Sequence, residues 1–310
     1  MYDRLALPRD LADADGIVFG KRGLVISVRG LKEMALAAPL APRRALSETF
    51  LAGDLHIPLA DLPFRYLFRG TQVLSAVARA LLAVRLPDAL FEELSALKTS
   101  DPVRYRHALA TAAVASRMII AAVGEPPALP EVAAAGLLHD LGMRHLSSSL
   151  LCATGRLDRQ QTMDVAAHPL LGAFYLAGLL GWHPAVEATL THHWQRGHGY
   201  PSLPRPPARA AQVVGVASAF TALTQARSYR SEPFDARGAA DVLVGEAQAG
   251  RIDLATVRLL VHALRGAQGN PREVRLGRAR PGHAPAVNQH TVIAGFPGCE
   301  VAFGLGQSGR

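Results

Sequence analysis

Residues 130–142 read PEVAAAGLLHDLG, and this stretch holds the clearest structural signal in the chain. Proline in a first turn is typical of a helix start, and Gly142 can end a helix because glycine readily adopts left-handed backbone conformations. The small residues 133–136 allow a neighbouring helix to approach closely. We therefore expect a helix that ends in an adjacent imidazole and carboxylate, His139 and Asp140, a pair that suits iron, manganese or zinc.

Histidine is concentrated around this stretch. Eight of the 12 histidines lie between residues 107 and 198, namely His107, His139, His145, His168, His183, His192, His193 and His198. A lone buried histidine is more often a satisfied core residue than a ligand. Here several expected helices each carry a candidate, and each unpaired buried imidazole would cost free energy. Convergence on a metal site between facing helices is therefore the interpretation that we favour.

The motifs that follow one another along the chain resemble the HD-GYP branch of the HD metal-dependent phosphohydrolases. They span about residues 100–265 and comprise His107, His139-Asp140, His168-Pro169, His192-His193, Gly199-Tyr200-Pro201, Ala222-Leu223-Thr224 and Arg227-Ser228-Tyr229-Arg230. The resemblance implies an all-α bundle with a metal site of two or three ions. It also implies hydrolysis of a phosphodiester, cyclic di-GMP, by a metal-activated water.

The resemblance assigns roles to individual residues. The implied ligands of one divalent ion are His107, His139 and Asp140. The residues implied to surround a second ion are Asp140, His168, His192 and His193. His139 and Asp140 would be the catalytic pair, and iron or manganese is the expected metal, two per chain in an active enzyme. The implied binding residues for the cyclic dinucleotide are Gly199, Tyr200, Pro201, Arg227 and Arg230, although structural ion pairs are an equal alternative for the two arginines.

The chain departs from the family pattern at several positions. Ser218 stands where the last metal-ligand aspartate is expected, and a neutral hydroxyl binds hard cations weakly. A second aspartate of that stretch is Thr221, and Met143 replaces a lysine. Val103 and Trp194 occupy two glutamate positions. Two functions therefore stay open: a cyclic dinucleotide phosphodiesterase, or a degenerate, non-catalytic signalling protein that acts by binding a ligand or protein.

Three segments differ in pattern. Residues 1–97 predict a small α+β region for input or partner docking, with a β-hairpin that joins 17–19 to 24–28. Residues 98–266 predict an almost entirely helical domain. The resemblance implies that this domain is HD-GYP-like, so the expected fold class is mainly α, an HD-domain-like helical bundle. Residues 267–310 are rich in Gly, Pro, Arg and Asn, and we expect a mostly disordered tail.

Composition narrows the remaining choices. The formal charge is +8, but only three of the 33 basic residues are lysines and the arginines are scattered, so we expect no nucleic-acid polymer as partner. An anionic small ligand fits the excess of basic residues better.

The 2 cysteines suggest neither a disulfide framework nor a zinc finger. Without a long uncharged apolar run or a secretory signal, we expect a cytoplasmic protein with no membrane contact, and a homodimer is one arrangement the N-terminal helices would allow.

Overall fold

The structure, a computed structural model, is built mainly from α-helices. It describes residues 4–7, 10–12, 18–146, 150, 157–197, 199–226, 230, 232–277 and 282–285. The α-helices are α1 (Val28–Ala37), α2 (His56–Ala60), α3 (Thr71–Leu82), α4 (Asp88–Ser100), α5 (Pro102–Val123), α6 (Leu129–Leu138), α8 (Arg159–Val165), α9 (His168–Leu180), α10 (Pro184–Thr191), α11 (Arg209–Thr224), α12 (Ala236–Gln248) and α13 (Leu254–Leu264). The 3₁₀-helices are η1 (Leu46–Glu48), η2 (Phe50–Leu55), η3 (Leu62–Phe64), η4 (Leu141–His145) and η5 (Pro271–Glu273).

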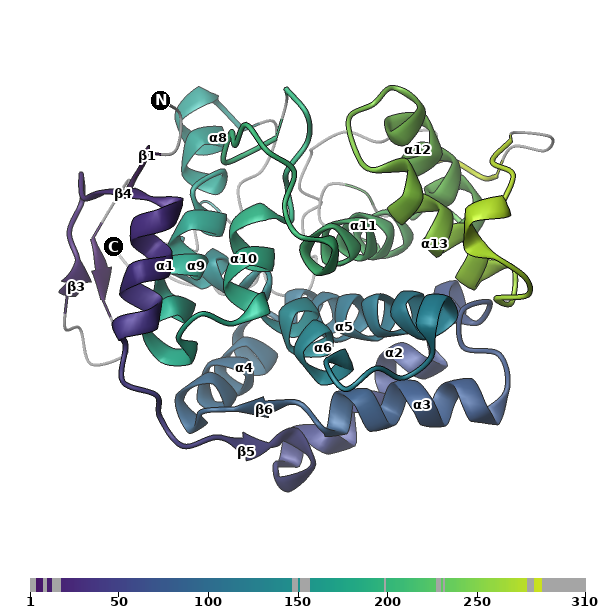
Figure 1. The fold of residues 1–310 in the computed structure, drawn as a ribbon, viewed down its shortest axis with the longest axis horizontal. Helices are drawn as coiled ribbons and strands as arrows, with labels where there is room; N and C mark the ends of the chain where they lie inside the picture. Colours follow the sequence, from purple (N-terminus) through teal and green to yellow (C-terminus); the bar gives the residue numbers. More distant parts are fainter. Residues whose placement is uncertain are drawn as a thin grey trace, which may run out of the picture.

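Helix α5 lies at the centre of this arrangement. Figure 1 shows α5 and α6 between α2 and α3 on one side and α11 to α13 on the other. Helix α5 contacts α6, α11 and α13 as well as α2, α3 and α4 of the N-terminal region. Buried side chains from Leu7 to Ala263 form one continuous apolar core around it. The mainly α fold class predicted from the sequence is confirmed.

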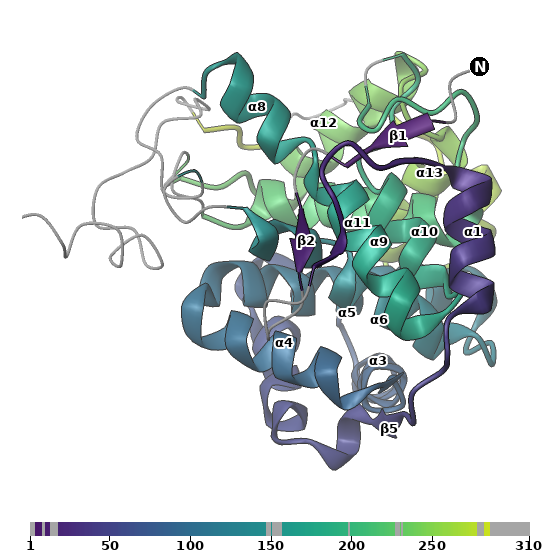
Figure 2. The same cartoon turned by 90° about the vertical axis from the view of Figure 1, so that its left-hand side faces the viewer.

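The strands are short and lie in the N-terminal region, where Figure 2 shows β1 and β2 beside the helices. They are β1 (Arg4–Ala6), β2 (Leu11–Ala12), β3 (Val18–Gly20), β4 (Val25–Ser27), β5 (Arg44–Ala45) and β6 (Arg85–Leu86), paired antiparallel as β1 with β4, β2 with β3, and β5 with β6. The predicted hairpin between 17–19 and 24–28 is wrong, because β3 and β4 each pair with an earlier strand. Its end is also different, since the Ser27 side chain accepts a hydrogen bond from the Gly30 backbone at 2.9 Å and starts α1.

Helix caps follow the sequence signals closely in the helical region. Asp158 and Gln161 form the predicted capping box of α8, and Asp235 and Asp253 cap α12 and α13. The cap of α5 is Asp101, whose side chain accepts from the Arg104 backbone. Helix α4 continues through residue 98, so the backbone is helical across the proposed boundary between the first two segments.

Two apolar helical stretches, Pro102–Val123 and Arg159–Leu180, are long enough to cross a membrane by length and composition. Within each stretch, 67% of the most apolar window is buried inside the protein. Core helices of soluble proteins pass the same test, so these stretches are weak support for a membrane span.

The tail expected after residue 266 is described only in part. Its η5 packs against α13, and the Gly282 backbone donates to Asp241 Oδ2 of α12 at 3.0 Å. Residues 278–281 and 286–310 lie outside the described residues, so disorder of the tail stays a prediction.

Glycines let the helices that carry the histidines approach one another. A Cβ added at Gly136 of α6 would lie 2.6 Å from the Ala112 Cα of α5. A Cβ at Gly142 of η4 would lie 2.0 Å from the His168 carbonyl oxygen of α9. Real Cβ atoms do not approach so closely, so larger side chains would force α5, α6 and α9 apart.

We expect Gly136→Ala to lower the free energy of unfolding by about 1–3 kcal/mol, because the added methyl overpacks the α5–α6 contact. Gly178→Ala on α9 is the matched control, since no atom lies within 4 Å of its added Cβ. Gly178→Ala should leave the free energy of unfolding unchanged or raise it by up to about 1 kcal/mol, because alanine has a higher helix propensity than glycine. Denaturant unfolding measures both, and equal effects would contradict this account of the packing.

Candidate metal centre

Asp140 lies at the centre of a cluster of imidazoles, and its two carboxylate oxygens face different partners. Oδ1 lies 3.2 Å from His168 Nε2 and 3.2 Å from His192 Nε2. Oδ2 lies 3.7 Å from His107 Nε2 and 3.6 Å from His139 Nε2. One carboxylate therefore connects two separate groups of nitrogen atoms.

Helix ends supply most of this cluster. His139 follows the last residue of α6, and Asp140 starts η4. His168 is the first residue of α9, while His192 and His193 follow α10. His107 differs because it lies inside α5, the central helix of the fold. Proline in the first turns of α6, α9 and α10 fixes where these helices begin.

Backbone carbonyls fix the orientation of three imidazoles. Nδ1 lies 2.8 Å from the Gly136 oxygen in His139, 2.7 Å from the Val165 oxygen in His168, and 2.9 Å from the Thr189 oxygen in His192. A carbonyl only accepts, so each Nδ1 must carry the proton. Each Nε2 then presents a lone pair toward Asp140, which is how second partners orient metal-binding histidines.

The electrostatics favour neutral imidazoles around a charged carboxylate. Burial lowers the pKa of His139 to about 4, against the opposing effect of Asp140. Burial also lowers the pKa of His168 and holds that of His193 well below its usual value. Burial alone would raise the pKa of Asp140, but its interactions with His139, His168 and His192 outweigh burial and hold that pKa well below its ordinary value.

These donors fit divalent cations. The ligand atoms of Asp140, His168, His192 and His193 lie within 4.8 Å of one another, and so do those of His107, His139 and Asp140. Converging lone pairs on neutral imidazoles repel one another and the carboxylate unless a cation lies between them. The structure thus brings the six residues together in the two groups that the resemblance implies, with nitrogen and oxygen donors suited to iron, manganese or zinc.

Ser218 of α11 faces the group formed by His107 and His139. Its Oγ lies 3.0 Å from His139 Nε2 and 3.3 Å from His107 Nε2. Ser218 is buried, with 6% of the residue exposed. Its hydroxyl therefore adds an oxygen to this group without adding negative charge. One group has two imidazoles and this hydroxyl around Asp140, and the other has three imidazoles.

Two polar residues of α11 and its C-terminal end support His107. Thr221 Oγ1 lies 3.1 Å from His107 Nδ1, and Gln225 Oε1 lies 3.3 Å from the same atom. The family pattern marks Thr221 only as a lost carboxylate, and none of the motifs includes Gln225. The signal that could have identified Gln225 is its position one helical turn after Thr221.

The expected substrate loop lies against the second group. The Tyr200 ring stacks on His193, with centroids 4.5 Å apart and an interplanar angle of 25°. A Cβ added at Gly199 would lie 2.5 Å from the His193 carbonyl oxygen, so the loop passes close to the backbone that carries this histidine. The bond between Tyr200 and Pro201 is cis. His198 lies outside the described residues.

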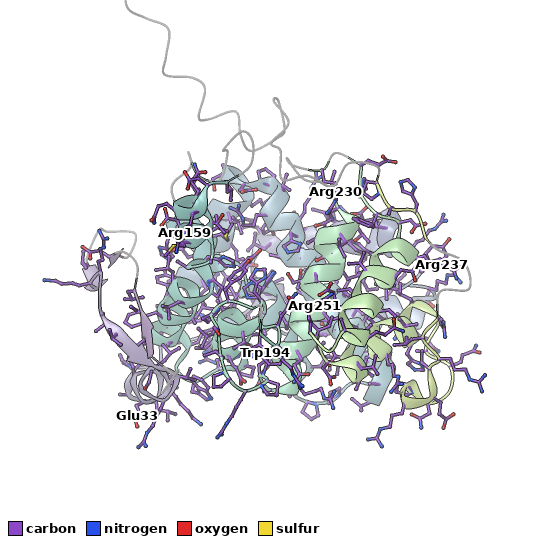
Figure 3. The ribbon with its side chains drawn as sticks, turned by 90° about the horizontal axis from the view of Figure 1, so that it is seen from above. Glu33, Arg159, Trp194, Arg230, Arg237 and Arg251 are labelled. Atoms are coloured by element: carbon purple, nitrogen blue, oxygen red, sulfur yellow. The ribbon has the colours of Figure 1, made fainter. Side chains whose placement is uncertain are left out.

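The arginines expected to contact phosphate have different outcomes. Arg227 lies outside the described residues. Arg230 is buried and its Nη2 donates to the Ala222 carbonyl and to the Leu223 carbonyl, the latter at 3.2 Å. It therefore binds the C-terminal end of α11, and Figure 3 shows Arg230 well apart from Trp194, the residue that follows the histidine pair. These contacts give Arg230 a structural role through backbone carbonyls rather than through the expected ion pair, and a phosphate contact of Arg230 stays a prediction.

A cavity adjoins the histidine cluster. It runs between residues 191–195, α11 and the start of α13, and its lining includes His192, His193, Ser218, Gln212 and Thr256. The Trp194 indole at its edge donates to the Leu203 carbonyl at 3.0 Å. The position expected to hold a glutamate after the histidine pair thus fixes the following loop instead.

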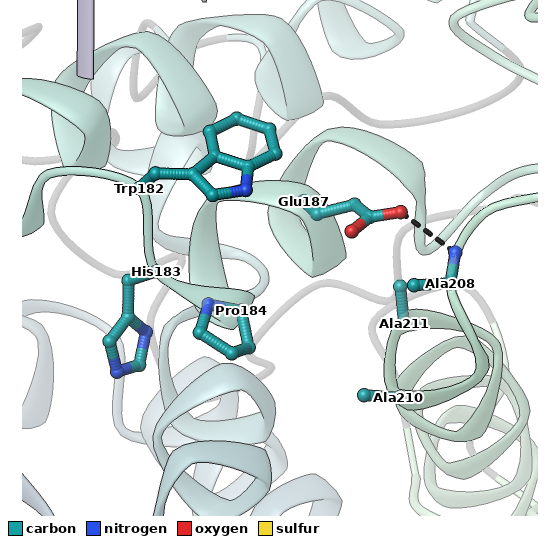
Figure 4. A pocket seen from close by; sticks show the side chains of 7 residues that line it. All are labelled: Trp182, His183, Pro184, Glu187, Ala208, Ala210 and Ala211. Atoms are coloured by element: carbon teal, nitrogen blue, oxygen red, sulfur yellow. Dashed lines mark hydrogen bonds between the residues drawn. The ribbon is translucent and has the colours of Figure 1, made fainter. Parts of the chain in front are cut away.

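Two further histidines lie outside the cluster. The His145 ring meets Tyr175 edge to face at 5.3 Å. His183 Nδ1 accepts from the Ala185 backbone at 3.1 Å and so caps α10. It lines a separate pocket with Trp182 and Glu187 (Figure 4), and burial lowers its pKa to about 4.

Comparisons with known proteins find relatives that are similar in sequence. The chain is 28% identical over 208 residues to cyclic di-GMP phosphodiesterase PA4108 of Pseudomonas aeruginosa, covering 63% of this chain and 50% of that protein. It is similar in sequence to cyclic dinucleotide phosphodiesterases. A second relative, 3'3'-cGAMP-specific phosphodiesterase 1 of Vibrio cholerae, is 28% identical over 127 residues, which cover 38% of this chain and 28% of the relative.

The chain therefore spans half or less of the length of these relatives, and no protein-family model matches it. Among solved structures, the HD domain of the L. monocytogenes phosphodiesterase PgpH in complex with cyclic-di-AMP is 14% identical. The match covers 60% of this chain and 99% of that domain, with a TM-score of 0.41. The two relatives in sequence are cyclic dinucleotide phosphodiesterases by name, which agrees with the resemblance seen in the sequence motifs.

We expect Arg230→Ala to lower the free energy of unfolding by about 1–3 kcal/mol, because buried carbonyls at the end of α11 would lose a charged donor. Arg237→Ala on the exposed side of α12 is the control and should change stability by less than about 0.5 kcal/mol. Thermal or denaturant unfolding gives the comparison. An Arg230→Ala protein as stable as the control would rule out this structural role.

Proposed function

We propose that the protein is a metal-dependent cyclic dinucleotide phosphodiesterase with cyclic di-GMP as its substrate. The observation that carries this proposal is the division of Asp140, whose Oδ1 and Oδ2 face two different sets of imidazole Nε2 atoms. This arrangement suits two cations that share one carboxylate, and the similar proteins hydrolyse cyclic dinucleotides according to their names. Iron or manganese fits the mixed nitrogen and oxygen donors.

The residues of the chain would divide the work. His107, His139 and Asp140 would hold one ion, while His168, His192 and His193 would complete the second site on the other side of Asp140. When bound, divalent ions supply Lewis-acid chemistry that activates water and neutralises phosphate charge. Tyr200 would close one side of the site because its ring already covers His193. The adjoining cavity along α11 offers room for part of the ligand.

Ser218 supports a second candidate, a non-catalytic protein that keeps the ligand pocket. Its neutral hydroxyl lies where a carboxylate would balance the charge of the first cation, so this cation should bind less tightly. Such a protein would signal through binding, with a protein partner at residues 1–97 or a homodimer. A cytoplasmic location accords with either candidate, since the long apolar stretches are mostly buried.

Replacing His139 and Asp140 together by alanine should remove the metal, because each group loses its shared carboxylate and one loses an imidazole. The measurement is metal content by ICP-MS on anaerobically purified protein, with folding checked by circular dichroism. His262→Ala is the matched control, since His262 is a buried histidine of α13 outside the cluster. A folded double variant with the full metal content of the wild type would refute the site.

Ser218→Asp should raise the metal content and the rate of cyclic di-GMP hydrolysis, because it adds a charged ligand next to His107 and His139. Ser218→Asn controls for side-chain volume and should not raise either quantity as far. If the aspartate variant gains metal without turnover, the non-catalytic candidate is favoured. Unchanged metal content would show that residue 218 has no part in the first site.

A further inference from the structure

Glu93 is a buried carboxylate in a part of the chain that supplies no site residue. It lies on α4 and is 6% exposed. A buried carboxylate is costly unless charged or polar groups surround it. Tyr175 Oη of α9 donates to Glu93 Oε1 at 2.9 Å, and Arg144 of η4 forms an ion pair with Glu93 Oε2. Both partners therefore belong to the elements that build the histidine cluster.

The element that carries Arg144 starts directly at the shared aspartate. The η4 turn follows Asp140, and the Met143 backbone donates to the Asp140 carbonyl at 2.9 Å. On one side, Gly142 packs against the His168 backbone without room for a Cβ. On the other side, Glu93 binds Arg144. A 3₁₀ turn has weaker internal hydrogen bonds than an α-helix, so such outside contacts decide where it lies.

We propose that Glu93 is a positioning residue for the metal centre. Through Arg144 it holds η4, and through Tyr175 it holds α9, so that Asp140 and His168 keep the separation that a shared cation requires. The N-terminal region thereby completes the site, and a displacement of α4 would reach Asp140 along this connection. This inference rests on the proposed function only in that Asp140 holds metal.

A second carboxylate contact, with a half-buried aspartate, offers a control. Asp54 of η2 pairs with Lys98 of α4 at 2.7 Å and accepts from Tyr105 Oη of α5 at 2.8 Å. It also joins the N-terminal region to a helix of the cluster by a carboxylate, a tyrosine and a cation. Tyr105 lies in a 22-residue α-helix, whose own backbone hydrogen bonds fix His107.

The test compares Glu93→Gln with Asp54→Asn in the full-length chain. It measures Mn²⁺ affinity by calorimetry, hydrogen exchange of the amides of residues 141–146, and thermal stability. Glu93→Gln should weaken Mn²⁺ binding about tenfold, as loss of an outer partner of a metal site does, and should speed exchange in 141–146. Asp54→Asn should lower stability without changing either of the other two quantities.

Arg144→Met and the double variant Glu93→Gln/Arg144→Met show whether the two residues act together. The double variant should weaken Mn²⁺ binding no more than Glu93→Gln alone, because Glu93→Gln already removes the ion pair with Arg144. If Glu93→Gln does not fold, Tyr175→Phe can replace it, because this change removes only the hydrogen bond from Tyr175 to Glu93. Tyr175→Phe should then speed hydrogen exchange in residues 141–146.

Unchanged Mn²⁺ affinity and exchange in folded Glu93→Gln would overturn the inference, as would equal changes in Asp54→Asn. A wild type that binds Mn²⁺ but does not hydrolyse cyclic di-GMP would refute the proposed activity alone. A wild type without metal would refute the metal centre, and exchange in 141–146 would still decide whether Glu93 holds η4.

Discussion

The structure depends on one carboxylate that several neutral imidazoles share. Asp140 is held in its charged form by the surrounding histidines, whereas burial keeps His139, His168 and His193 neutral. Such a cluster has too many lone pairs directed at one another to be a stable core without a cation. Metal binding therefore depends on how α5, α6, α9 and α10 pack, because these helices and their ends carry the cluster.

Close helix packing keeps the ligand atoms of the cluster near one another. The ligands come from four helices and their ends, so small displacements of any helix would separate them. Gly136 and Gly142 remove the side chains that would hold α5, α6 and α9 apart. The small residues at these positions therefore allow the close helix packing that the cluster needs.

The sequence predicted most of the cluster because its members lie at helix ends marked by proline, glycine or a polar cap. His139, His168 and His192 are found where those signals place them, and the signals depend only on neighbouring residues. The hairpin prediction was wrong because β3 pairs with β2, the strand before it, and β4 pairs with β1. A turn signal between two segments does not record whether either segment has another strand as its partner. Gln225, Glu93 and the carbonyl contacts of Arg230 depend on tertiary contacts, which no local pattern records.

The departures from the family pattern gain a physical meaning in the structure. Ser218 takes the place of a charged ligand while its oxygen still faces His107 and His139. Thr221, which replaces a second aspartate, supports His107 from the opposite ring nitrogen. The cluster therefore keeps an oxygen at this place but has one negative charge less near the first proposed cation.

In the proposed metal centre, Asp140 separates two cation positions. The most direct measurement is a crystal structure of Mn²⁺-loaded protein with anomalous scattering recorded at the manganese edge. Two anomalous peaks are expected, one within about 2.5 Å of Asp140 Oδ1 beside His168 and the other equally near Oδ2 beside His107. Peaks away from Asp140, or no peak in the cluster at saturating Mn²⁺, would contradict this arrangement.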